Sequence, residues 1–240
     1  MYLLSCLTNK NYSFIILFSF IMYSNKVYDV TLKHPSRFII CGPSQSGKST
    51  FVEKLLNNMK DMFGFYFDSI IYFSGQSFPS FDSVDGRKII KTTKITPEFI
   101  DRLDENFRNL IIIDDNMHLI VNDLSMSDLF TKKSHHKNIT VIFIVQNLFP
   151  KGNYTRDISS NVQYIVLMSN PRERLQIRTL SSQIEGVNSG FILDCYEDAT
   201  SHNNTSYGYL FMDFNLETPV ELRYRTNIFP NEEHIVYIKN

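Results

Sequence analysis

The feature that most constrains the fold of this chain is the segment from Gly42 to Thr50, which reads GPSQSGKST. It matches the phosphate-binding loop pattern G-x-x-x-x-G-K-[ST] without a gap. Residues 37–41 before it are mostly apolar, as in a buried strand, and residues 51–63 after it carry apolar side chains at helical spacing. A strand, a glycine loop and a helix in this order surround a polyphosphate with backbone N–H groups and the positive end of a helix dipole. The complete motif in this context disfavours a chance glycine turn, and it predicts a nucleoside triphosphate site.

Each residue type in the loop has a physical task. Glycine at positions 42 and 47 allows tight turns and close backbone approach, and the proline at position 43 offers no N–H donor. Lys48 is expected to reach the β- and γ-phosphates, and the hydroxyl of Ser49 is expected to bind Mg²⁺. The predicted ATP-binding residues are therefore Gly42, Pro43, Ser44, Gln45, Ser46, Gly47, Lys48, Ser49 and Thr50.

The rest of the chain predicts an α/β fold, in which a mainly parallel sheet is sandwiched by helices. A length of 240 residues, with 43% hydrophobic and 20% charged residues, suits one such domain. Apolar runs alternate with helical patterns, as in a parallel sheet covered on both faces. The expected strands are residues 38–41, 69–74, 88–95, 110–113, 139–145, 164–168, 207–214 and 235–238, with a lead-in strand at 27–32. The expected helices are residues 48 to about 61, a helix opened by Thr96 and Pro97, and residues 123–133, 171–183 and 190–198.

The first 25 residues differ from the rest. Ser13 to Tyr23 is strongly apolar but shorter than the ~20 residues that span a bilayer, and no small-residue cleavage site follows it. It can be a membrane-associating segment, a strand or helix added to the core, or translated sequence upstream of the true start at Met22. We favour the last interpretation and expect a chain that starts at Met22 to fold and to be active. The predicted organisation is residues 1–25 as a separate segment and 26–240 as the ATPase domain.

Hydrolysis needs a carboxylate for the metal and a group that orients or deprotonates the attacking water. The apolar run of residues 110–113 ends in Asp114 and Asp115. Two acids at a strand end are unremarkable alone, but here they follow a complete phosphate loop. We predict that Asp114 binds Mg²⁺ and that Asp115 is the catalytic base.

Residues 139–145 form the most apolar strand, and Gln146 follows them. In P-loop ATPases whose catalytic acid follows the metal-binding Asp, an additional strand lies between the loop strand and the acid strand, and a polar residue at its tip senses the γ-phosphate. Gln146 fits that role, because ligands of open α/β sheets bind at the carboxyl ends of strands. Arg156 and Arg172 follow later strands and are candidates for an arginine that stabilises transition-state charge in a neighbouring subunit. For each arginine, a solvated surface position is an equally good interpretation.

Five segments together resemble the DNA-packaging ATPases of the FtsK–HerA superfamily, with the closest similarity to those of Polinton/Maverick elements and related double-stranded DNA viruses. They are GPSQSGKST, IIIDD, VIFIVQNLFP, YIVLMSNPRE and RTNIFPNEEHIVY, and the resemblance covers residues 27 to 240. It implies an ASCE-type P-loop ATPase that assembles as a ring, often a hexamer, and drives double-stranded DNA into a capsid. Lys48, Ser49, the acid pair and Gln146 carry over position by position, whereas the family more often has Asp-Glu where this chain has Asp114-Asp115.

Net charge and cysteine content bear on the compartment and the partners of the protein but do not identify its substrate. The formal net charge is −1, so no overall basic surface indicates nucleic acid, although a ring motor can confine basic residues to its channel. The lysines between positions 132 and 137 are a candidate DNA contact, but a solvated turn is the simpler interpretation. Three widely spaced cysteines fit a reducing compartment, so we expect an intracellular or virion-associated protein with no stable membrane partner. The alternatives are another P-loop enzyme, such as a kinase or a helicase-like NTPase, or a nucleotide-binding scaffold without turnover.

Overall fold

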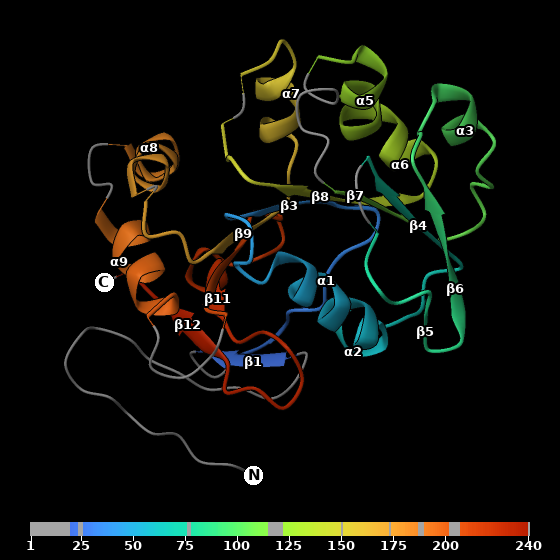
Figure 1. Ribbon diagram of the computed structural model, residues 1–240. Coiled ribbons are helices and arrows are strands. Elements are labelled where there is room, and N and C mark those ends of the chain that lie inside the picture. The colour runs from blue at the N-terminus through green and yellow to red at the C-terminus, as the bar shows by residue number, and fades with distance from the viewer. Residues whose placement is uncertain are drawn as a thin grey trace.

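The computed structural model describes residues 20–23, 26–75, 78–114, 122–149, 151–172, 174–186, 190–201 and 207–239. In these parts of the chain, ten strands form one sheet in the order β12-β11-β10-β9-β3-β8-β7-β4-β6-β5 (Figure 1). Each pair of neighbouring strands between β9 and β6 in this order is parallel. The pairs formed by β10, β11, β12 and β5 are antiparallel. The predicted α/β class with a mainly parallel sheet is therefore confirmed.

The parallel strands are β3 (Arg37–Cys41), β4 (Ser69–Ser74), β6 (Arg87–Thr92), β7 (Asn109–Asp114), β8 (Ile139–Val145) and β9 (Tyr164–Met168). The antiparallel strands are β5 (Ser83–Val84), β10 (Tyr209–Asp213), β11 (Tyr224–Thr226) and β12 (Ile235–Tyr237). Because parallel strands buried on both faces read as continuous apolar runs, β4, β8 and β9 have the bounds that the sequence predicts. The three-residue strand β11 carries no such run and was not predicted.

Helices cover both faces of the sheet (Figure 1). On one face lie α1 (Lys48–Asn57) and α2 (Met59–Phe63), which pack on the side chains of Phe38, Ile40 and Ile112. The opposite face is covered by α3 (Pro97–Asp101), α7 (Thr155–Ser160), α8 (Arg174–Glu185) and α9 (Gly190–Ala199). Between α3 and α7 in the chain lie α5 (Leu124–Asp128), the π-helical turn η1 (Leu129–Lys133) and α6 (Ser134–His136), and the 3₁₀ turn η3 (Val220–Leu222) precedes β11.

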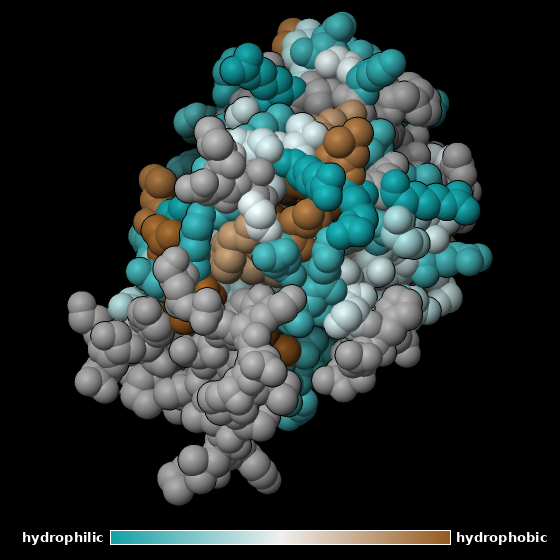
Figure 2. All heavy atoms as spheres, turned by 90° about the vertical axis from the view of Figure 1, so that its left-hand side faces the viewer, coloured by the Kyte–Doolittle hydropathy of each residue, from teal (hydrophilic) through white to brown (hydrophobic). Residues whose placement is uncertain are grey.

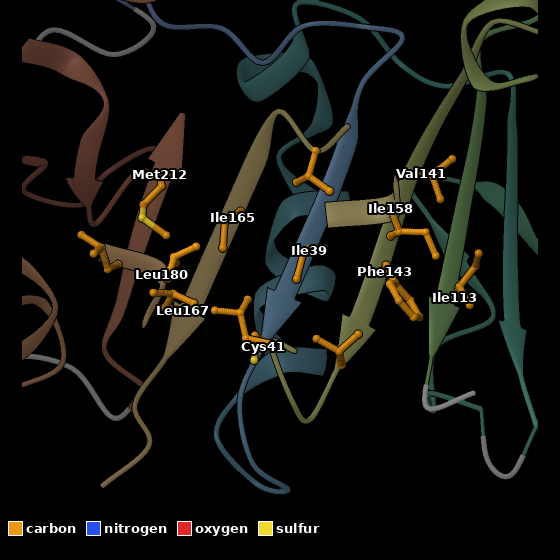
Figure 3. Close-up of a cluster of buried hydrophobic side chains, with 14 of the residues drawn as sticks. Ile39, Cys41, Ile113, Val141, Phe143, Ile158, Ile165, Leu167, Leu180 and Met212 are labelled. Atoms are coloured by element: carbon orange, nitrogen blue, oxygen red, sulfur yellow. The ribbon is translucent and has the colours of Figure 1, made fainter. Parts of the chain in front are cut away.

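The core on the α7 and α8 face is continuous across the central strands. Figure 3 shows Ile39 and Cys41 of β3 among Ile165 and Leu167 of β9 and Val141 and Phe143 of β8, with Ile158 of α7 and Leu180 of α8 over them. All of these side chains are buried. Alternate residues of each strand point to this face and the others point to α1, so a one-residue slip in register would move every apolar side chain to the wrong layer.

Three predicted helices have other bounds in the structure, and for one of them the reason is a local side-chain bond. The helix expected at residues 48–61 is divided at Asn58, whose side chain donates a hydrogen bond of 2.8 Å to the carbonyl of Lys54. Asparagine side chains compete in this way for backbone groups and interrupt helices. The helix expected at residues 123–133 contains the π-helical turn η1, and α8 begins at Arg174 rather than at Pro171.

The beginning of the described chain forms a separate two-stranded antiparallel sheet of β1 (Phe20–Tyr23) and β2 (Lys26–Asp29). The end of the apolar segment 13–23 is thus strand, while residues 1–19 lie outside the described residues. The expected lead-in strand at 27–32 ends earlier, at Asp29. That the chain is active when it starts at Met22 stays a prediction.

The surface that carries α8 and α9 shows hydrophobic groups (brown) between hydrophilic ones (teal) (Figure 2). Leu175 of α8 is 75% exposed, the second-highest value among the exposed large apolar side chains of the described residues. No helix in the described residues combines the length and the apolar character needed to cross a membrane.

Candidate nucleotide site

The loop between β3 and α1 is built into the centre of the sheet. The N–H of Gly42 donates to the carbonyl of Val145 at 3.1 Å, which extends the β3–β8 pairing one residue into the loop. A Cβ on Gly42 would lie 2.6 Å from the Cβ of Met168 in β9, closer than any side chain can pack. Glycine is required here because two strands and the loop meet at this point.

The loop backbone has left-handed conformations at Gln45, with φ of 65°, and at Gly47, with φ of 95°. Such residues turn successive N–H groups toward one side and form a concave anion-binding nest. For a non-glycine residue this conformation costs roughly 1 kcal/mol, so Gln45 is held there by its surroundings. The hydroxyl oxygen of Ser46 is buried beside this backbone and has no hydrogen-bond partner among the described residues.

The first turn of α1 has backbone N–H groups that the helix itself does not use. The helix begins after Gly47, which has no side chain to cap it, and its first turn has no acidic residue. The first helical bond runs from the N–H of Phe51 to the carbonyl of Gly47, so the N–H groups before Phe51 have no partner in the helix. Ser49 and Thr50 are exposed in this turn. Uncapped donors at a helix start, next to a concave loop, fit a phosphate chain.

Lys48 places a positive charge at the loop. Its ammonium group donates to the carbonyls of Gly42 and Pro43, both at 2.7 Å. These two bonds fold the side chain back over the loop that precedes it. The charge therefore lies where the nest would hold the anionic oxygens of a phosphate.

Asp114 ends β7 and lies on the α1 side of the sheet, since Leu110 and Ile112 of the same strand belong to the core beneath α1. Its Oδ2 accepts a hydrogen bond of 2.5 Å from the hydroxyl of Tyr72 in β4. Burial and the negative charge of Asp114 raise the pKa of Tyr72 well above its usual value, so this hydroxyl stays protonated and donates. Tyr72 was missed in the sequence, where it reads as one more apolar residue of a buried strand.

Strand β8 lies between β3 and β7, so the additional strand predicted between the loop and the acid is confirmed. Ile144 of β8 pairs with Asp114, and the next residue, Val145, accepts the bond from Gly42. Gln146 follows directly and is exposed at this edge, between the loop and the acid. Asp115 lies outside the described residues.

The two predicted arginines are both exposed but hold different places. Arg172 follows β9, the strand whose Met168 closes against the loop. Arg156 belongs to α7, which ends near the opposite edge, where the carbonyl of Asn161 accepts a bond of 3.2 Å from Arg37 at the start of β3. Arg156 itself lies in the first turn of α7, eleven residues after β8 ends at Val145, whereas Arg172 lies four residues after β9 ends at Met168. Arg172 is thus the nearer of the two, along the chain, to the end of a strand.

The lysines at the end of η1 and in the turn after α6 are paired with acids. Lys133 bonds to Asp101 at 2.7 Å, Lys137 lies 3.6 Å from Glu105, and Lys132 lies 3.5 Å from Asp128. Their charges are therefore largely balanced, which favours the solvated turn over a DNA contact. The described residues hold no cluster of three or more His, Cys, Asp or Glu side chains placed for a metal. A Mg²⁺ bound by one hydroxyl, one carboxylate, phosphate oxygens and water needs no such cluster.

Comparisons with known proteins bear on the fold. No family model matches the sequence, and no curated protein matches it. Among solved structures, the genome packaging NTPase B204 from Sulfolobus turreted icosahedral virus 2, in complex with ATP-gammaS, aligns with a TM-score of 0.51 and 14% identity over 76% of this chain and 94% of its own. The DNA-packaging ATPase B204 from Sulfolobus Turreted Icosahedral Virus aligns with a TM-score of 0.50 and 13% identity over 77% of this chain and 95% of its own.

The chain has the fold of a P-loop NTPase. At this level of identity the comparison establishes the fold and not the substrate. The site geometry agrees with that fold, because the loop, Lys48 and Asp114 meet at the carboxyl edge of the parallel strands. The residues present therefore fit a Mg²⁺–nucleoside triphosphate.

Proposed function

We propose that the protein hydrolyses ATP and uses the energy to move double-stranded DNA. The observation that carries the hydrolytic part is the order of groups at one edge of the sheet. The lysine-bearing loop after β3, Gln146 after β8 and Asp114 at the end of β7 lie on three adjacent strands. Phosphoryl transfer depends mainly on positioning and charge stabilisation, and these side chains supply both.

Each residue has a proposed task in that reaction. Lys48 and the loop N–H groups hold the phosphates, and Ser49 with Asp114 holds Mg²⁺, which would neutralise charge on the phosphate oxygens. Asp115 deprotonates or orients the attacking water. Gln146 senses the γ-phosphate. Asp114 is held in one orientation by Tyr72, which supports its assignment to the metal.

The DNA substrate and the assembly are proposed from the fold and from one exposed surface. B204 is described as a DNA-packaging ATPase, and it shares this fold. The exposed Arg172 and Leu175 follow β9 within one stretch, as expected of a surface that meets a neighbouring subunit in a ring. A capsid partner and the closer relation to Polinton/Maverick packaging ATPases belong to the same proposal.

The deciding experiment is ATP hydrolysis by the purified full chain, with Mg²⁺ or with EDTA, and with double-stranded DNA, single-stranded DNA or none. We expect Mg²⁺-dependent hydrolysis that double-stranded DNA stimulates more than single-stranded DNA does. Lys48→Ala should lose both nucleotide binding and activity, because the charge of Lys48 lies at the loop that would hold the phosphates. Nucleotide binding without turnover would indicate a scaffold, and phosphate transfer to a small acceptor would indicate a kinase.

A further inference from the structure

The aromatic residue Tyr207 lies directly on the phosphate loop. A Cβ on Gly47 would be 2.5 Å from Cγ and 2.7 Å from Cβ and Cδ1 of Tyr207, so this side chain packs on the loop backbone where Gly47 has none. Tyr207 is nevertheless 46% exposed. Among the described residues, its hydroxyl makes no hydrogen bond. One part of the side chain thus touches the loop while much of it is open to solvent.

The start of β10 determines this position. β10 runs antiparallel to β9, with Tyr209 opposite Met168, so the residues before β10 lie at the carboxyl edge of β9. The carbonyl of Gly208 accepts a bond of 3.2 Å from the N–H of Ser169, which ties the segment to that edge. Tyr207 therefore comes to the same edge of the sheet as the loop, although it belongs to an antiparallel strand connection.

The order of the strands in the sheet indicates which end of a bound nucleotide would face which strands. Asp114 and Gln146 lie on the β8 and β7 side of the loop, and the reacting γ-phosphate must face them. The base end of the nucleotide then faces the other side, toward β9 and β10, which is the side of Tyr207. An exposed aromatic side chain beside a phosphate site suits the π-face of a base.

We propose that Tyr207 stacks on the base of the bound nucleotide. This inference rests on the proposed ATP site and adds to it a contact that the loop motif does not contain. Stacking accepts any base, so Tyr207 contributes affinity for nucleotides over bare polyphosphate rather than selectivity for adenine.

The first test compares Mg–ATP with Mg–tripolyphosphate, which keeps the phosphates and lacks the base. We expect Tyr207→Ala to weaken ATP binding about tenfold, or about 1.4 kcal/mol, and to leave tripolyphosphate binding unchanged. Tyr207→Phe keeps the ring and should bind ATP like the parent. An equal loss for both ligands would show that Tyr207 only supports the loop, and unchanged ATP binding in Tyr207→Ala would show that it makes no contact. Either result overturns the proposal.

The second test uses the absence of tryptophan from the chain. Tyr207→Trp introduces a single tryptophan, which is excited selectively over the tyrosines, at the proposed contact; stacking on a base should quench its fluorescence with ATP but not with tripolyphosphate. Phe107→Trp is the control, because Phe107 is 49% exposed and precedes β7 at the opposite edge of the sheet. Equal quenching in both variants, or none with ATP, would overturn the stacking contact. A parent protein that binds no ATP would overturn the proposed function as well, whereas failure of the stacking contact alone appears only in the variants.

Discussion

The hydroxyl of Tyr72 in β4 lies 2.5 Å from Oδ2 of Asp114 in β7 and donates to it. Tyr72 is buried and Asp114 is half-buried, so the hydroxyl holds one carboxylate oxygen from the protein side and limits the rotation of the carboxylate. A carboxylate that must bind a metal benefits when a second group holds one of its oxygens. Tyr72 is therefore a positioning residue for Asp114.

Tyr72→Phe should raise the Mg²⁺ concentration needed for half-maximal hydrolysis by about tenfold, in the range seen when outer-shell partners of metal ligands are removed. The ring remains, so the core should keep its packing and the thermal midpoint should change little. Hydrolysis rates over a Mg²⁺ titration check this. Tyr164→Phe is the matched control, because Tyr164 is also buried but donates nothing to the site and accepts a bond from the N–H of Lys33. Equal Mg²⁺ dependence in the parent and in Tyr72→Phe would contradict the positioning role.

Asp115→Asn should keep ATP binding and lose turnover by roughly 10²-fold or more, as expected when a general base is removed. Asp114→Asn should instead raise the Mg²⁺ concentration needed for half-maximal hydrolysis, since its carboxylate is assigned to the metal. Single-turnover rates at saturating ATP, together with nucleotide titrations, separate the two effects. If Asp115→Asn hydrolyses ATP like the parent, Asp115 is not the base.

If a neighbouring subunit supplies a catalytic arginine, mixtures of two inactive variants should regain ATP hydrolysis. Subunits carrying Lys48→Ala are mixed with subunits carrying Arg172→Ala, each inactive alone, and activity should return at interfaces that combine an intact loop with an intact arginine. An arginine of this kind raises the turnover rate of P-loop enzymes by ~10³-fold or more. Arg172 is the first candidate because it follows the strand beside the loop, and Arg156 is the second.

The control for these mixtures is Arg178→Ala, which removes an exposed arginine from the middle of α8 and should leave hydrolysis unchanged. Co-assembly of the two kinds of subunit is verified by differential tagging. Absence of recovery with both Arg172→Ala and Arg156→Ala, in mixtures that do co-assemble, would rule out an arginine supplied in trans by either residue.

Acid should destabilise the fold through His34, which precedes β3. Its ring lies edge-on to Phe65 and Phe67, and its Nδ1 shares a hydrogen bond of 2.7 Å with the hydroxyl of Thr140. Burial is the main reason that the pKa of His34 is lowered to about 4; the charge of Arg108 acts in the same direction, and a hydrogen bond with Asn138 and the charge of Asp68 oppose it. In the unfolded chain the pKa is 6.5.

Above pH 6.5 the His34 ring is neutral in both the folded and the unfolded protein, so its contribution to the free energy of unfolding is fully present. Between pH 6.5 and about 4 the unfolded chain binds a proton that the folded protein does not, so stability falls as the pH falls. At about 1.4 kcal/mol per pKa unit, the loss is at most about 3 kcal/mol. Urea unfolding at pH 7 and at pH 4.5 should show a shallower pH dependence for His34→Gln than for the parent. His136→Gln, at an exposed position, should keep the slope of the parent.

The sequence by itself determined the elements whose signal is local. The bounds of β4, β8 and β9 follow from short apolar runs, and the loop motif together with the apolar run before Asp114 predicts the nucleotide edge of a parallel sheet. These elements can be predicted because the spacing of apolar residues within each segment indicates which positions are buried. The interruption at Asn58 is local as well, but it depends on a side-chain bond that helical spacing does not reveal.

Only the tertiary structure decided which side chains complete the site. Tyr72 and Asp114 are 42 residues apart and meet because β4 pairs with β7, and Tyr207 reaches Gly47 because β10 turns back antiparallel beside β9. Hydrophobic periodicity places a tyrosine in a strand but does not say which strand lies next to it. That choice depends on how the two helical layers and the sheet pack together over the whole chain, which is a long-range balance that no single segment contains.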